Sequence, residues 1–169
     1  MIGELVTREK KVAFCAVPGA EGTAVNHRMK GFTTFSVSKN PTEYSRRYVD
    51  EAFERTDVTG ISASIEFTFD QFDGNEVHDY IAGIIDAELI GSDAKIDIIV
   101  VDFTKEGTGE NSFVAKKRTY TVIPGTEGDT TDAYTYSGTL RADSETETGT
   151  ATSSDEWQTC TFVKDGEAA

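Results

Sequence analysis

The stretch ISASIEFTFD, residues 61–70, is the clearest β-strand in this sequence of 169 residues. Apolar and polar residues alternate along it, and successive side chains of a strand point to opposite faces of a sheet. One face of this strand is therefore apolar and the other polar, which predicts a sheet that covers a core on one side. The apolar positions are Ile61, Ala63, Ile65, Phe67 and Phe69.

A helix is predicted next, in DGNEVHDYIAGIIDAELIG, residues 73–91. Apolar residues recur there at three- and four-residue steps, which is the spacing of one helix face. Asp73 or Asn75 can cap its N-terminus, and Gly91 can end it. We expect the helix to span about residues 75–89 and to pack its apolar stripe over the sheet. The stripe consists of Val77, Tyr80, Ile81, Ile84, Ile85 and Leu89.

Six further windows are predicted as strands because they are rich in β-branched and aromatic residues. They are residues 11–17, 30–37, 95–103, 113–123, 133–142 and 157–163. Within the third, Ile96–Val101 is almost continuously apolar, which suits a central strand. Many strands and one helix predict a mainly β fold. We expect a single domain over residues 1–169, an antiparallel β-sandwich or barrel with one flanking α-helix.

One stretch is predicted to be a flexible loop. Residues 143–156 read DSETETGTATSSDE and contain no bulky apolar side chain. Such a segment cannot bury enough surface to offset the entropy that it loses on ordering. We therefore expect a mobile loop that leads into a last strand.

The chain is strongly acidic, with 30 Asp and Glu against 16 Lys and Arg and a formal charge of −14. Binding to nucleic acid or to an anionic membrane depends on Lys and Arg, so the charge argues against both partners. The longest purely aliphatic run, Ile98–Val101, is too short to cross a bilayer, and the N-terminal residues lack the apolar core of a signal peptide. We expect a soluble protein made in the cytoplasm.

Motifs for catalysis, metal binding or cofactor binding are not recognisable. His27 and His78 have no Cys or second His at metal-ligand spacing, so we expect each to be exposed or locally hydrogen-bonded. An EF-hand loop with Gly74 at its sixth position would begin on Phe69 and end on Tyr80, and neither supplies the required ligand. Phosphate-binding glycine motifs and a nucleophile elbow are also missing. We expect no enzymatic activity, no cofactor and no metal.

Two cysteines, Cys15 and Cys160, lie in the first and the last strand windows. Two are too few for a disulfide scaffold, and cytosolic thiols normally stay reduced. We expect both to be buried as small apolar residues. A bond between the terminal strands stays open only for a particle that matures outside the cell.

Between two strand windows lies a polar segment, NPTEYSRRYVDEAFERTDVTG, residues 40–60. A helix is one interpretation, since Asn40 is a good N-cap, Pro41 suits a first turn and Glu43 stands at the capping-box position. An extended segment is the other, because charged and apolar residues alternate from Tyr48 onward. Neither conformation offers a face that is apolar enough for the core of a single chain.

The order of these elements and several local motifs resemble the major tail protein, or tail tube protein, of long-tailed phages with non-contractile tails. The matching stretches are GFTTFSVSKNPTEYSRRYVDEAFERTDVTG from Gly31, ISASIEFTFD, DGNEVHDYIAGIIDAELIG, IDIIVVDF and VIPGTEGDTTDAYTYSGTLRA. Together they cover about two thirds of the chain. The N-terminal segment and the loop from Asp143 match weakly.

The resemblance implies a β-sandwich with a flanking helix, whose subunits form hexameric rings that stack into a tube. DNA passes through the tube, whose inner wall is typically acidic, without specific binding. A net charge of −14 is consistent with such a lumen, but it also serves simple solubility. The expected partners are further copies of this chain and the tape-measure, tail-terminator and baseplate or distal tail proteins. The expected location is the virion tail, after synthesis in the host cytoplasm.

In proteins of this kind, the long connection between two early strands reaches neighbouring subunits or rings. The corresponding segment here is an extended arm at about residues 39–60. Interfaces favour arginine and aromatic side chains, so its arginines are expected to pair with acids of a neighbour and its aromatics to act as anchors. A solvated loop or hairpin with internal ion pairs is the alternative. The expected interface residues are Tyr44, Arg46, Arg47, Tyr48, Asp50, Phe53, Arg55 and Asp57.

Two other functions stay open. Another virion component of related fold, such as a tube terminator, a baseplate protein or a head-decoration protein, would form a single ring or cap. A β-sandwich that binds carbohydrate or protein would need an exposed aromatic cluster, for which Tyr134, Tyr136 and Trp157 are the candidates. Because these three fall in predicted strands, packing against the sheet is the favoured explanation.

Overall fold

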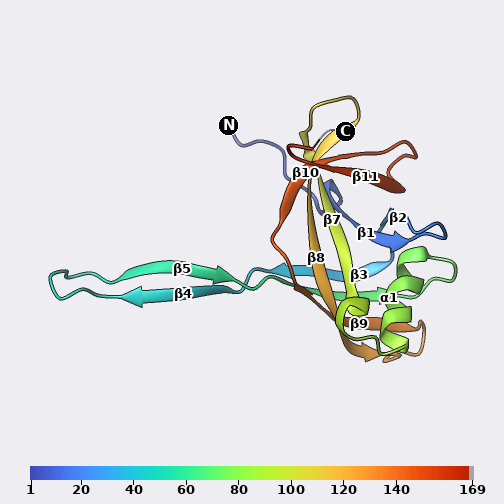
Figure 1. Ribbon diagram of the computed structural model, residues 1–169, viewed down its shortest axis with the longest axis horizontal. Helices are drawn as coiled ribbons and strands as arrows, with labels where there is room; N and C mark the ends of the chain where they lie inside the picture. The colour runs from blue at the N-terminus through green and yellow to red at the C-terminus, as the bar shows by residue number, and fades with distance from the viewer. Residues whose placement is uncertain (168–169) are drawn as a thin grey trace.

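The computed structural model describes residues 1–167 and shows the mainly β fold with one α-helix that the sequence predicts (Figure 1). All seven predicted strands are present, and β2, β4, β5 and β10 are additional. The strands are β1 (Lys11–Pro18), β2 (Ala24–Arg28), β3 (Phe32–Ser38), β4 (Pro41–Arg46), β5 (Arg55–Ile61), β6 (Ser64–Asp70), β7 (Lys95–Glu106), β8 (Ser112–Glu127), β9 (Thr135–Ala142), β10 (Glu147–Thr152) and β11 (Thr159–Lys164). The helix is α1 (Glu76–Asp86), and short 3-10 turns lie at Arg8–Lys10 and Gly91–Ala94.

Six of the strands close into an antiparallel barrel, in the order β10-β11-β2-β1-β7-β8, because β10 also pairs with β8. The long strand β8 makes this closure possible. Its first half, from Ser112 to Lys117, pairs with β10, and its second half, from Tyr120 to Glu127, pairs with β9. Beyond β8 the sheet continues as β9-β6-β3, so β3 is the end strand of the nine-stranded sheet.

The barrel wall formed by β1, β7 and β8 separates two hydrophobic cores. In β1, Phe14 points into the barrel and Cys15 points to the other side, where α1 packs. Strand β7 alternates in the same way, with Ile99 in the barrel and Ile98 in the second core. Both faces of β7 are therefore buried, which explains the nearly continuous apolar run from Ile96 to Val101.

Helix α1 covers the second core. Its N-cap is Asn75, whose side chain accepts hydrogen bonds from the backbone N–H groups of Val77 and His78 at 3.1 Å. The helix ends at Asp86, earlier than the predicted residue 89, and Glu88 then takes a positive φ of 50°. Leu89 is therefore outside the apolar stripe and is 40% exposed. The buried positions are Val77, His78, Ile81, Ala82, Ile84 and Ile85.

The prediction of a mobile loop at residues 143–156 is wrong, because β10 occupies Glu147–Thr152 and closes the barrel. The inward positions of β10 are Gly149 and Ala151, both buried. A Cβ atom on Gly149 would lie 2.2 Å from the backbone oxygen of Val163, so β11 approaches too closely for any side chain there. Bulky residues are absent from this strand because neighbouring strands fill the space, and not because the segment is disordered.

Candidate assembly interface

The predicted extended arm is present as a β-hairpin, formed by β4 and β5, that projects from the rest of the molecule (Figure 1). We call residues 41–61 the arm, residues 47–54 at its end the tip, and the remainder of the described chain the body. The arm prolongs the paired strands β3 and β6, since the pair Ser38 and Ser64 is followed by the pair Pro41 and Ile61. The helix interpretation of this segment is therefore wrong.

Asn40 fixes the base of the arm. It takes a positive φ of 45°, a conformation that Asn tolerates better than most residues. Its side-chain amide donates hydrogen bonds to the Ser62 carbonyl at 3.0 Å and to the Ser64 hydroxyl at 3.1 Å. The Ser62 N–H in turn donates to the Asn40 carbonyl at 3.3 Å. The junction between body and arm is thus held by hydrogen bonds that link its two strands.

Paired residues of the hairpin share a face. One face carries Tyr44 opposite Asp57 and Arg46 opposite Arg55. The guanidinium carbon of Arg46 lies 5.4 Å from the centre of the Tyr44 ring, which is cation–π geometry. Arg55 instead turns to Glu51, with a hydrogen bond of 2.8 Å from Nε to a carboxylate oxygen. The two opposed arginines therefore have separate partners inside the arm.

The second face of the arm carries mostly smaller side chains and the exposed aliphatic residue Val58. Ser45 and Thr56 stand opposite each other, with their hydroxyl oxygens 2.9 Å apart. Val58 stands opposite Glu43 and is 61% exposed. Alternation at period two, which the sequence suggests from Tyr48 onward, holds only within the strands, because the chain turns at the tip.

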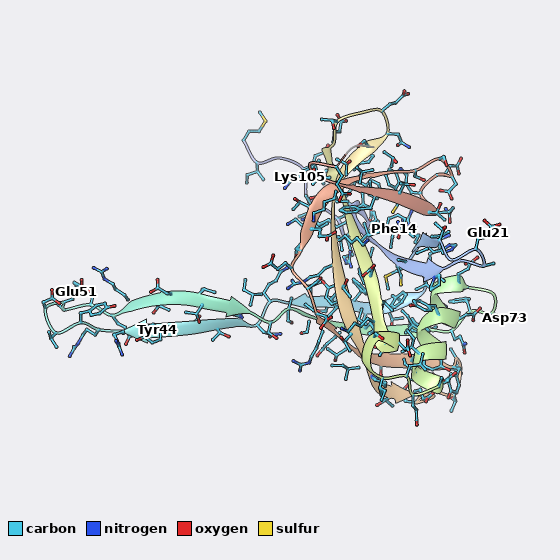
Figure 2. All side chains as sticks on the ribbon, in the orientation of Figure 1. Phe14, Glu21, Tyr44, Glu51, Asp73 and Lys105 are labelled. Carbon is cyan, nitrogen blue, oxygen red and sulfur yellow. The ribbon has the colours of Figure 1, made fainter. Side chains whose placement is uncertain are left out.

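All eight predicted interface residues are exposed, and the structure divides them into two groups. Tyr44, Arg46, Arg55 and Asp57 share a face of the hairpin. Arg47, Tyr48, Asp50 and Phe53 belong to the tip, the end of the arm where Figure 2 labels Glu51, far from the body. Sequence reasoning missed three exposed apolar residues of the arm, although β-branched residues in a polar segment are a usable signal. These are Val49, Val58 and Ile61. For Ile61 the prediction of a place on the apolar, core-covering face of the strand at residues 61–70 is wrong, because the chain leaves the arm there and β6 begins only at Ser64.

The arm carries several exposed apolar side chains and has no core of its own. Phe53 is 83% exposed and Val49 is fully exposed, while Tyr44 and Tyr48 are each about half exposed. An isolated two-stranded hairpin is marginally stable in water. Exposed apolar side chains that gather in one segment mark a site of interaction. The arm therefore has the properties of a segment that is completed by contact with another molecule.

The histidine that lies in α1 has a structural role. His78 is fully buried and stacks on Phe69 at a ring separation of 4.5 Å. The Phe72 N–H donates to its Nδ1 at 3.1 Å, so Nε2 carries the proton and donates to the Lys30 carbonyl at 2.6 Å. Burial lowers the pKa of His78 below its usual value. The prediction of local hydrogen bonding is confirmed, and the exposed alternative is wrong for this residue.

Both cysteines are free and buried, as predicted. Cys15 lies in the core under α1 and Cys160 lies in the barrel, so the barrel wall separates them. Burial raises the pKa of each thiol to about 12, which leaves neither of them reactive as a thiolate. A bond between the two terminal strands is incompatible with these positions.

The three aromatic residues considered for ligand binding do not form one cluster. Trp157 packs edge-on against Phe103 and Phe113 in the barrel, with ring centres 5.0 and 5.6 Å apart. Tyr136 is buried in the other core, and its hydroxyl donates to the carboxylate of Asp86 at 3.1 Å. Tyr134 alone is largely exposed, at 51%. Packing accounts for two of the three residues.

Within residues 1–167, no group of three or more His, Cys, Asp or Glu side chains is placed to hold a metal ion. No helix in that range combines the length and the apolar character needed to cross a membrane.

Comparisons with known proteins find similar chains among solved structures. No protein-family model matches this chain, and no curated protein does. Among solved structures, a chain of the PVC sheath-tube complex, an extracellular contractile injection system in its extended state, has a similar fold. The similarity covers 85% of this chain and 90% of that chain, with 16% identical residues and a TM-score of 0.45. A similarity of this degree carries no argument about function.

Proposed function

We propose that this protein is a structural subunit that assembles with copies of itself through the arm, and that the assembly is a tail tube. The observation that carries the proposal is the arm itself, a projecting hairpin with a hydrogen-bonded base and exposed aromatic, aliphatic and arginine side chains. Such side chains are enriched at interfaces, and on a hairpin that packs against no other part of the chain they do not stabilise a monomer.

The sequence resemblance to tail tube proteins supplies the form of the assembly. On this basis the subunits form hexameric rings, the rings stack, and DNA passes through an acidic lumen during delivery. The formal charge of −14 supports a lumen that repels DNA, because like charges prevent contacts that would hold the duplex. The resemblance also implies a tail without a contractile sheath.

The proposed partners follow from a tube of defined length in the virion tail. Copies of this chain form the wall, a tape-measure protein lies inside it, and terminator and baseplate or distal tail proteins close its ends. We propose no catalytic role, because the buried histidine and the two buried thiols all have structural roles.

The other candidate functions differ from a tube in ways that can be observed. A terminator, baseplate or decoration protein would form one ring and stop. A carbohydrate-binding module would use an exposed aromatic platform, and of the three candidate residues only Tyr134 offers one. Electron microscopy of the negatively stained protein separates these functions, since a tube subunit gives stacked rings or tubes and a glycan-binding module stays monomeric.

Removal of the arm tests its role directly. Ser62 already donates to the Asn40 carbonyl, so a Gly-Gly turn that replaces residues 41–61 can join β3 to β6 without disturbing the body. We expect a folded monomer with the near-UV circular dichroism of the full chain and no tubes. Tubes of normal appearance from this variant would contradict the proposal. Replacing the exposed Ile90 of the body by Ser is the control, and it is expected to leave assembly intact.

A further inference from the structure

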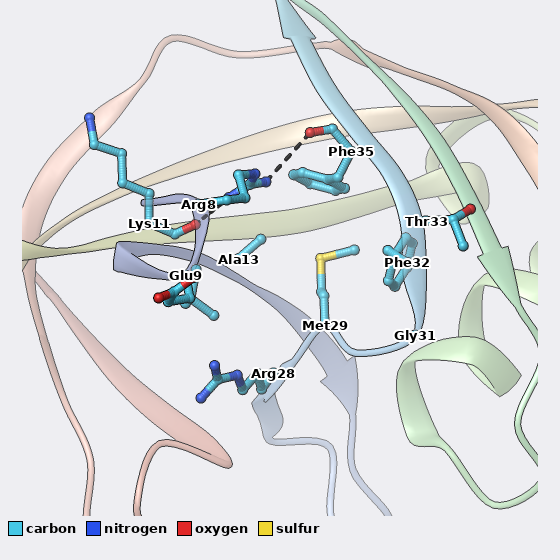
Figure 3. A pocket seen from close by; sticks show the side chains of 11 residues that line it. Arg8, Glu9, Lys11, Ala13, Arg28, Met29, Gly31, Phe32, Thr33 and Phe35 are labelled. Carbon is cyan, nitrogen blue, oxygen red and sulfur yellow. Dashed lines mark hydrogen bonds between the residues drawn. The ribbon is translucent and has the colours of Figure 1, made fainter. Parts of the chain in front are cut away.

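A groove of about 410 Å³ lies on the body between β1, β2 and β3 (Figure 3). Its apolar lining includes Ala13, Met29, Phe32 and Phe35. Three cationic side chains also line it, from the 3-10 turn before β1, from β1 and from β2, and they are Arg8, Lys11 and Arg28. The groove thus combines an apolar floor with positive charge, in a chain whose formal charge is −14.

The positive charge of the groove is poorly compensated from within the chain. Glu9 is the one acidic residue among its lining residues. Lys11 has an acid nearby, Asp102, at 3.8 Å. Neither Arg8 nor Arg28 forms an ion pair with any residue in the described range 1–167. The groove therefore has charge available for an acidic partner.

Strand β3 adds a backbone surface to the groove. It is the end strand of its sheet and pairs on one side only, with β6. The Phe35 carbonyl points into the groove, where it accepts a hydrogen bond from Arg8 at 3.5 Å. An unpaired strand edge readily pairs with an extended segment of another chain. The groove thus offers a partner backbone groups as well as side chains.

The tip of the arm has the complementary chemistry. Val49 and Phe53 are the most exposed apolar side chains of the arm, at 108% and 83%. Asp50 and Glu54 follow each of them directly in the sequence, and neither acid has an ion pair within residues 1–167. The tip thus presents apolar anchors next to free negative charge, which matches the apolar floor and the cations of the groove.

A tip cannot reach the groove of its own chain. The arm holds the tip away from the body, as the positions of Glu51 and Phe14 in Figure 2 show, and the hydrogen bonds of Asn40 fix its base. A contact between tip and groove therefore joins two molecules. It uses different surfaces on the two partners, so it repeats head to tail and generates a closed ring or an open filament.

We infer that the tip of one copy docks in the β1–β3 groove of the next copy. This inference rests on the proposed self-assembly and identifies the surface that receives the arm. Phe53 and Val49 cover the apolar floor, and Asp50 and Glu54 pair with Lys11 and Arg28.

Reversal of charge on each side tests the contact. One variant carries Asp50→Lys and Glu54→Lys in the tip, and the other carries Lys11→Glu and Arg28→Glu in the groove. Each is expected to lose pelletable polymer by about tenfold or more, because like charges then face each other. A chain that carries all four changes restores the opposite charges at every contact and is expected to regain polymer. Failure of this chain to exceed the two parent variants would overturn the inference.

Cross-linking gives a test that does not depend on charge. Phe53→Cys in one batch of protein and Thr33→Cys, in the groove lining, in another are mixed before assembly and then oxidised. The native Cys15 and Cys160 are buried, so the added thiols are the reactive ones. We expect disulfide-linked dimers from the mixture. Phe53→Cys mixed with Ser92→Cys, an exposed position outside the groove, is the control and is expected to give none.

The outcomes separate the inference from the proposed function. Tubes that form normally with the reversed groove, and no tip-to-groove disulfide, would refute the docking site and leave the tube subunit standing. Disulfide dimers from Thr33→Cys alone would show that two grooves face each other, which also refutes it. A wild-type protein that stays monomeric at every concentration would refute both. Restored polymer in the fourfold variant and the tip-to-groove disulfide together would establish the contact.

Discussion

The body and the arm are both built from antiparallel hairpins, but the body buries its large apolar side chains and the arm exposes them. In the body, strands with alternating residues bury one or both faces, and Phe14, Ile65 and Leu140 are completely inaccessible. In the arm, all residues of β4 are exposed and the large apolar residues of β5 are exposed as well. An isolated strand pair is only marginally stable in water, so this difference supports the proposal that another molecule covers the arm.

This comparison predicts that substitutions in the body change the free energy of unfolding, while substitutions in the arm change assembly. The largest expected effect on unfolding belongs to Phe14→Ala, because Phe14 is fully buried in the barrel beside Trp157. We expect a loss of about 3–5 kcal/mol, from lost burial and the cavity that remains. Urea unfolding at a concentration that keeps the chain monomeric measures it.

The matched control for Phe14→Ala is Phe53→Ala in the arm. It removes the same side chain from a position that is 83% exposed, so the free energy of unfolding is expected to change by less than about 0.5 kcal/mol. Equal losses from the two variants would show that the arm packs against the body in solution, which would remove the distinction between the two regions.

A second substitution tests whether β10 belongs to the body. A side chain on Gly149 would collide with the backbone of β11, so Gly149→Ala is expected to cost about 1–3 kcal/mol. Gly83→Ala in α1 is its control, because no atom outside the local helix backbone lies within 4 Å of the added Cβ. The control is expected to stabilise the protein by about 0.5–1 kcal/mol, since Ala favours the helix. A neutral Gly149→Ala would mean that residues 143–156 are as mobile as their composition suggests.

The same strand shows where sequence reasoning reached its limit for the fold. Strands with bulky alternating residues, such as β6, are visible in the sequence because their side chains make the core. Strand β10 contributes Gly149 and Ala151 instead, and β2 is a mostly polar strand whose Asn26 side chain bonds to the Cys160 carbonyl at 3.0 Å. These two strands form because they pair with neighbouring strands. The local residue pattern carries no information about such pairing.

The two surfaces of the candidate interface also differ in how far the sequence predicts them. The arm is one continuous segment, whereas the groove is built from separate elements. The residues of the arm leave a helix and an extended segment open, and the resemblance to tail tube proteins favours the extended arm. Its turn and its two faces could not be predicted. The groove could not be predicted at all. Its cations Arg8, Lys11 and Arg28 come from separate elements, and only the pairing of β1 with β2 and the end position of β3 bring them to one place.

A third prediction concerns the pH dependence of the body. Burial lowers the pKa of His78 below its usual value of 6.5, so the unfolded chain takes up a proton at a higher pH than the folded chain does. The contribution of His78 to stability is therefore present above pH 6.5 and is lost as the pH falls below that value. Protonation would also remove Nδ1 as the acceptor for the Phe72 N–H. Urea unfolding between neutral and mildly acidic pH measures the slope.

The control for this prediction is His78→Gln, which keeps a polar side chain that does not titrate. Its stability at neutral pH is expected to be lower, because the two hydrogen bonds of the ring are not both reproduced. Its loss of stability between neutral and mildly acidic pH is expected to be smaller than that of the wild type. Parallel pH curves for the two proteins would show that groups other than His78 set the dependence.

The smallest expected effect on unfolding comes from the double variant Val49→Ser and Phe53→Ser at the tip. Both side chains are almost fully exposed in the single chain, so the free energy of unfolding is expected to change by less than about 0.5 kcal/mol. Assembly, measured by sedimentation and electron microscopy, is expected to be lost, because these residues are the proposed anchors. Ile90→Ser is the matched control, since Ile90 is 84% exposed on the body. If this control abolished assembly as fully as the tip variant, a general loss of exposed apolar surface would explain both results. The exposed apolar residues of the arm would then have no specific role in assembly.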